Sequence, residues 1–132
     1  MLRFFPFMSL AVLAYAVTVA FFGAPLSREI VTFGLPSGTQ FVLTTSELLL
    51  AVSTAILFLE LMNAASARST SILNHGLSML VFLVCFVVFL KVPGFGTGTF
   101  LIITLMSLVD VVAGYSISIL TARRDMSFGT GD

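Results

Sequence analysis

The sequence predicts an all-α membrane protein: a four-transmembrane-helix bundle with a short extracytoplasmic β-hairpin-like loop between the first two helices. Three observations support this. The 132 residues are 58% hydrophobic and only 9% charged, with a mean hydropathy of +1.15, which is far from a soluble composition. The apolar residues are grouped into four runs separated by turn-forming segments. Runs of this length match a hydrocarbon core about 30 Å thick.

The expected spans are residues 4–22, 46–63, 72–90 and 100–121, all within one integral membrane domain covering 1–132. The first run follows a charged start, which is typical of either a signal peptide or a first membrane helix. We expect the helix, because the run ends in Phe21-Phe22-Gly23-Ala24-Pro25 and lacks a good small-residue cleavage site.

The loop 24–43 has two β-rich segments, around Val31 and Val42, on either side of Gly34-Leu35-Pro36-Ser37-Gly38. Proline followed by serine and glycine is typical of a turn, so we expect a short hairpin at the membrane surface. Thr44 and Glu47 then form a capping box at the start of the second span. A role in capping the helix explains Glu47 better than a role in a functional site does.

The last span carries a carboxylate, Asp110, near its midpoint. Small and polar residues lie on the same side of that helix: Thr104, Ser107, Gly114, Ser118 and Thr121. An ionisable group within a membrane normally faces the interior of a bundle and finds partners there. We therefore expect this seam to face protein or water and not lipid.

Placing each span's midpoint at the bilayer centre predicts that Tyr15, Thr54 and Asp110 lie at similar depth, with Ser107 one turn away. These four residues form the candidate intramembrane polar site. Two interpretations are open. Asp110 either holds the helices together through hydrogen bonds from these hydroxyl groups, or binds a proton or cation.

A second polar pair is predicted on the cytoplasmic side. Glu60 and His75 lie at similar distances from the short link between the second and third spans. Such a pair either joins these two helices or relays protons near neutral pH.

Composition excludes several classes of function. With one histidine, one cysteine and six scattered acids, we expect no metal ligand set, no cofactor and no enzymatic activity. Cys85 has no second thiol to pair with.

The net charge is zero and no basic block is present, so we expect no nucleic-acid partner. A glycine-rich segment, Gly94-Phe95-Gly96-Thr97-Gly98, superficially resembles a phosphate loop. It lacks the spacing of such a loop and is interpreted as a turn.

The positive charges favour one orientation. One side of the predicted bundle carries Arg3, Arg68, Arg123 and Arg124, and the other side carries Arg28 and Lys91. The side with more positive charge is normally cytoplasmic. We therefore expect both termini in the cytoplasm.

The chain resembles small four-span inner-membrane proteins of proteobacteria. The resemblance is clearest in two segments, LNHGLSMLVFLVCFVVFL and FLIITLMSLVDVVAGYSISILTARRD. The resemblance covers Leu48 to Asp125 and implies a bacterial inner membrane location, but it transfers no mechanism. Besides the lipid bilayer, the expected partner is another membrane protein or a second copy of the chain. We expect a non-enzymatic accessory, assembly or structural subunit that acts through helix–helix contacts. The alternative is an oligomeric proton- or cation-coupled transporter or channel that uses Asp110.

Overall fold

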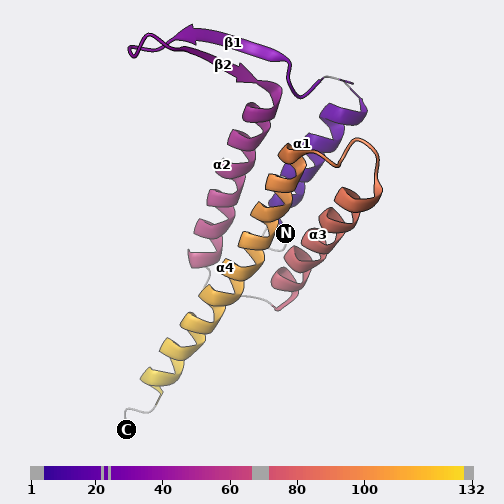
Figure 1. Cartoon of the computed structure of the whole chain (residues 1–132). Coiled ribbons are helices and arrows are strands. Elements are labelled where there is room, and N and C mark those ends of the chain that lie inside the picture. Colours follow the sequence, from indigo (N-terminus) through magenta and orange to yellow (C-terminus); the bar gives the residue numbers. More distant parts are fainter. Residues whose placement is uncertain (1–4, 22, 24, 67–71, 130–132) are drawn as a thin grey trace.

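Four helices and one hairpin make up the computed structural model, in the order α1, β1, β2, α2, α3, α4 (Figure 1). The structure describes residues 5–21, 23, 25–66 and 72–129. The helices are α1 (Met8–Ala20), α2 (Thr45–Ser66), α3 (Ile72–Lys91) and α4 (Gly98–Phe128), and the strands are β1 (Glu29–Gly34) and β2 (Gln40–Thr44). Four helices and a hairpin between the first two agree with the predicted order of elements.

Three of the helices are long and apolar enough to cross a membrane among the residues described: Thr45–Ser66, Leu73–Lys91 and Gly98–Ser127. This finding is consistent with an integral membrane protein. Helix α1 is different, because its 13 residues rise only about 20 Å against a hydrocarbon core of about 30 Å. The predicted span 4–22 is therefore a shorter helix in the structure, and residues 1–4 and 22 lie outside the described part.

Local chemistry explains where α1 begins. The Pro6 carbonyl accepts a hydrogen bond from Ser9 N–H at 3.0 Å, in the turn that leads into Met8. Proline fixes its own φ and has no N–H to donate, so it is tolerated at the edge of a first helical turn and not deeper in a helix. At the other end of α1, Gly23 has a φ of +49°, outside the range of a right-handed helix.

The predicted hairpin is confirmed. Strands β1 and β2 are antiparallel, with Phe33 opposite Phe41 and a register irregularity between Glu29 and Val31. The Gly38 amide donates to the Leu35 carbonyl at 2.9 Å across the turn, and Gly38 has a φ of +84°. A residue with positive φ at this position is typical of a hairpin turn and favours glycine.

The predicted capping box is also present. The Glu47 carboxylate accepts hydrogen bonds from the backbone N–H (2.6 Å) and the hydroxyl of Thr44, at the junction between β2 and α2. The Ser46 hydroxyl bonds that of Thr99 at 2.6 Å, which ties the start of α2 to the start of α4.

The packed interior lies between α1 and those parts of α2, α3 and α4 that are nearer the hairpin. Its large buried side chains include Met8, Tyr15, Phe100 and Ile103. Tyr15 contacts both Phe100 and Phe95, with ring centroids 4.9 Å and 5.4 Å apart. Most of the outward-facing side chains of the long helices are apolar and exposed, Phe58, Leu80 and Leu105 among them, as expected for surfaces that contact lipid.

Candidate functional site: an intramembrane polar cluster

Buried polar side chains from three helices gather on the inner faces of α2, α3 and α4. We call these residues the polar cluster: Ser53 and Glu60 from α2, His75 and Ser78 from α3, and Thr104, Ser107 and Asp110 from α4. Each is at most 6% exposed. Of the predicted inward-facing seam of the last helix, Thr104, Ser107, Asp110 and Gly114 are buried, whereas Ser118 and Thr121 are partly exposed.

Glu60 holds the N-terminus of α1. Its two carboxylate oxygens accept hydrogen bonds from the backbone amides of Phe7 (3.2 Å) and Met8 (2.9 Å). The first amides of a helix have no partner inside that helix, and the Phe7 side chain makes no capping bond. The partial positive charge at the helix N-terminus also favours a carboxylate. A side chain of α2 therefore takes the place that a local N-cap residue has in other helices.

The predicted pairing of Glu60 with His75 requires correction. Both Glu60 oxygens accept hydrogen bonds from α1 amides, whereas the His75 imidazole bonds Ser118 of α4. The prediction considered only the short link between α2 and α3. It missed that α1 begins at the level of Glu60, where its first amides have no partner within the helix and attract the carboxylate.

His75 instead binds α4. Its Nε2 lies 2.5 Å from the Ser118 hydroxyl oxygen, and that hydroxyl donates to the Gly114 carbonyl at 2.9 Å. The Ser118 hydroxyl therefore links the His75 imidazole to the α4 backbone. The imidazole also lies 5.1 Å from the Tyr115 ring, at an interplanar angle of 30°.

Gly114 makes this contact with His75 achievable. A Cβ placed on Gly114 would lie 2.8 Å from Nδ1 and 2.9 Å from Cε1 of His75, closer than such atoms approach one another. The absence of a side chain at Gly114 allows the imidazole to rest on the α4 backbone. Small residues play this role widely where membrane helices pack together.

Asp110 lies between these groups. It is 5% exposed, the Ser78 hydroxyl offers its carboxyl group a hydrogen bond, and His75 and Glu60 are near enough to act on it electrostatically. Its Oδ2 atom is buried and has no hydrogen-bond partner among the described residues. An unsatisfied carboxyl oxygen in a low-dielectric interior is costly, and a proton, a cation or a water molecule bound there would satisfy it.

The other predicted partners of Asp110 lie elsewhere. The Tyr15 hydroxyl donates to the Gly94 carbonyl at 3.1 Å and lies 2.6 Å from the Thr97 hydroxyl, near the start of α4. Thr54 is exposed, and its hydroxyl bonds the Leu50 carbonyl one turn earlier. The depth argument placed Tyr15 at the centre of a full span, but α1 is shorter than a full span, and Tyr15 lies at the level of the turn before α4.

Ser107 is buried one turn from Asp110, as predicted, but its hydroxyl donates to the Thr104 carbonyl at 2.7 Å. Ser78 takes its place beside the carboxyl group. The sequence did contain a signal for Ser78, since it follows His75 by three residues and so shares its helix face. Asn74 lies one residue before His75, and its buried Oδ1 has no hydrogen-bond partner in the described part of the chain.

Among the residues described, no group of three or more His, Cys, Asp or Glu side chains is placed to hold a metal ion. Cys85 is buried and its thiol is free. Within the polar cluster, Glu60 and His75 join helices, whereas the hydroxyls of Ser53, Thr104 and Ser107 bond carbonyls of their own helices. Asp110 keeps one carboxyl oxygen without a partner among the described residues.

Comparison of the chain with protein-family models, with curated proteins and with solved structures finds no match in any of the three.

Proposed function

We propose that this protein is a non-enzymatic accessory or assembly subunit of the bacterial inner membrane, which binds another membrane protein or a second copy of itself through helix–helix contacts. The observation that carries the proposal is the length of α4. Its 31 residues exceed the 22 of α2 and the 20 of α3, and Figure 1 shows α4 extending past the ends of both helices.

The side chains of this extension, residues 122–127, are all exposed, and Met126 is 68% exposed. A helical segment that buries no apolar face is marginal in water, because most helix stability in proteins comes from tertiary packing. A partner that covers the extension would supply that packing. We therefore assign residues 122–127 as the contact region and name it the α4 extension.

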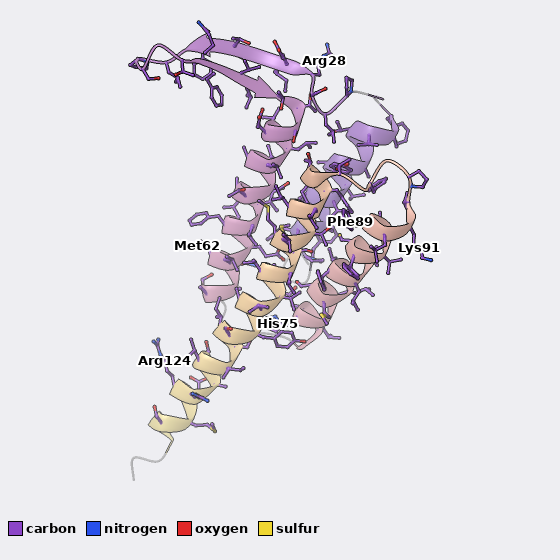
Figure 2. All side chains as sticks on the ribbon, in the orientation of Figure 1. Arg28, Met62, His75, Phe89, Lys91 and Arg124 are labelled. Atoms are coloured by element: carbon purple, nitrogen blue, oxygen red, sulfur yellow. The ribbon has the colours of Figure 1, made fainter. Side chains whose placement is uncertain are left out.

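The orientation that fits this proposal places both termini in the cytoplasm. Arg123 and Arg124 lie on the α4 extension, whereas Arg28 and Lys91 lie toward the hairpin end of the bundle (Figure 2). This distribution follows the positive-inside bias. Arg3 and Arg68 lie outside the described residues.

Site-specific photocrosslinking in native membranes tests the assembly role. A photoreactive side chain at Met126 should give discrete protein adducts. The matched control is Leu105, which lies on the same helix before the α4 extension and is 50% exposed. A photoreactive side chain there should give lipid adducts. Protein adducts at neither position, or equally at both, would contradict a contact centred on the α4 extension.

A second function is favoured by the unpartnered Oδ2 of Asp110. The carboxyl groups of Asp110 and Glu60 are both buried and act on each other electrostatically, and two negative charges in a low-dielectric region would repel strongly. A proton or a monovalent cation bound at Oδ2 would relieve that repulsion. The second candidate is therefore a proton- or cation-coupled transporter or channel, and the flux measurement described for Asp110 below separates it from the first.

A further inference from the structure

The hairpin has one continuous apolar face. The register places Val31 opposite Leu43 and Phe33 opposite Phe41, and alternate residues of a strand point to the same side. We call these four residues the hairpin's apolar face. The Phe33 and Phe41 rings pack against each other with centroids 5.1 Å apart, yet Val31, Phe33 and Phe41 remain 39–49% exposed. Thr32, its partner Val42 and Gln40 lie on the opposite face. Ile30, at the register irregularity, is 45% exposed.

The hairpin is fixed to α2 at its base. β2 ends at Thr44 and α2 begins at Thr45, so no linker separates them. The Thr45 and Ser46 amides donate to the carbonyls of Arg28 (3.0 Å) and Leu26 (2.9 Å). These two bonds tie the chain before β1 to the first turn of α2, so the direction of the hairpin is set by the direction of the helix.

This arrangement determines how the hairpin meets a membrane. Figure 1 shows the hairpin running across the axis of α2 at the end of the bundle, away from the other helices. Helix α2 is membrane-length, so a hairpin that crosses its axis lies along the membrane plane. The first turns of α2, which follow the hairpin directly, also expose apolar side chains, Leu48 and Val52, and Arg28 lies at the base of the hairpin (Figure 2).

We infer that the hairpin's apolar face rests on the lipid bilayer and is buried at the boundary between the headgroups and the acyl chains. Lipid is favoured over a protein partner for two reasons. Four side chains are few for a stable protein interface, which buries on the order of 800 Å² per partner. The hairpin also runs directly into membrane-length α2, whose first turns expose the apolar Leu48 and Val52. Burial in lipid further explains how an isolated two-stranded hairpin, marginal in water, persists outside the bundle.

The sequence has no tryptophan, so a single Phe33→Trp substitution gives a unique fluorophore. The protein is reconstituted into phosphatidylcholine vesicles, with or without acyl chains brominated near the headgroup. Phe33→Trp should emit at shorter wavelength than the matched Thr32→Trp, which lies on the opposite face. It should also be quenched several-fold more by the brominated lipid, whereas aqueous iodide should quench Thr32→Trp more strongly.

Phe41→Trp, across the strand pair from Phe33, provides a second reporter on the same face, and unchanged far-ultraviolet circular dichroism shows that each variant is folded. Iodide quenching that is equal at positions 32 and 33 would overturn the inference. So would short-wavelength emission from both Phe33→Trp and Phe41→Trp without quenching by brominated lipid, because protein, a second copy included, would then cover the face. Stronger lipid quenching at Thr32→Trp would also overturn it.

Discussion

The Glu60 carboxylate caps helix α1 by accepting a hydrogen bond from the amide of Met8, 52 residues earlier in the chain, at 2.9 Å. A second bond comes from the Phe7 amide. This contact sets the level at which α1 begins, and therefore which part of the bundle α1 covers.

Removing the Glu60 carboxylate should destabilise α1. We expect Glu60→Ala to lower the free energy of unfolding by about 2–4 kcal/mol, since two charge-assisted bonds are lost and two amides are left unpaired. Glu60→Gln keeps one acceptor oxygen and should cost roughly half as much. The measurement is equilibrium unfolding in mixed micelles, with amide hydrogen exchange at Met8. Glu47→Gln, in the exposed capping box at the other end of α2, is the control and should leave Met8 exchange unchanged. Unaltered exchange at Met8 in Glu60→Ala would show that the cap is unimportant.

Gly114→Ala should destabilise the protein although alanine is the better helix former. Helix propensity alone favours alanine by about 1 kcal/mol, but the new Cβ would lie 2.8 Å from Nδ1 of His75. We expect a net loss of about 1–3 kcal/mol from this overpacking. Gly76→Ala is the matched control, because a Cβ placed on Gly76 would meet nothing within 4 Å, and it should be neutral or stabilising.

The cause of the Gly114→Ala loss is checked by a double-mutant cycle with His75→Ser. Removing the imidazole should cancel most of the penalty of Gly114→Ala, so the two losses should be clearly less than additive. Additive losses would mean that the close approach of His75 to Gly114 is not what limits this position.

Tyr15→Phe should loosen the connection between α1 and the turn before α4. The substitution keeps the ring contacts with Phe95 and Phe100 but removes the hydroxyl that bonds Gly94 and Thr97. We expect a loss of about 1–2 kcal/mol, the usual effect of losing a partly buried hydrogen bond. Tyr115→Phe serves as the control because Tyr115 is 46% exposed. Equal melting temperatures for the two variants in detergent would contradict a stabilising role for the Tyr15 hydroxyl.

Two substitutions at Asp110 separate the two candidate functions. Asp110→Asn keeps the shape and hydrogen-bonding capacity but cannot titrate, and Asp110→Leu removes both. If Asp110 only joins helices, Asn should be tolerated and Leu should destabilise the bundle by about 1–3 kcal/mol, because the Ser78 hydroxyl loses its partner. We expect this outcome for an accessory subunit.

The opposite result identifies a proton or cation site. In that case Asp110→Asn would melt like the wild type but would lose a pH-gradient-driven flux, measured with a pH-sensitive dye enclosed in proteoliposomes. The Ser107→Ala variant controls for general disturbance, since Ser107 lies one turn away and bonds only its own helix.

Orientation is tested by cysteine labelling in a background where Cys85 is replaced by alanine. With both termini in the cytoplasm, Ser37→Cys at the hairpin turn should react with a membrane-impermeant maleimide added outside spheroplasts, and Arg124→Cys should react only after permeabilisation. The reverse pattern would invert the topology, and labelling of both from outside would mean that α4 does not cross the membrane.

The sequence by itself determined the features that depend on local chemistry. Apolar length predicted α2, α3 and α4, turn residues predicted the hairpin around Gly38, and residue spacing predicted the Glu47 capping box and the inward face that carries Asp110. Each of these depends on residues a few positions apart. Helical periodicity shows which side of a helix is polar, and turn chemistry shows where the chain reverses.

Only the tertiary structure decided which polar groups meet. Periodicity gives the face and approximate depth of a residue, but it does not say how far one helix is shifted along another. That shift is set by long-range contacts: Glu60 holds the start of α1, Tyr15 reaches the turn at Gly94, and Gly114 admits the imidazole of His75. As a result Asp110 has Ser78 beside it in place of Tyr15 and Thr54, and one of its oxygens stays unpaired within the described bundle.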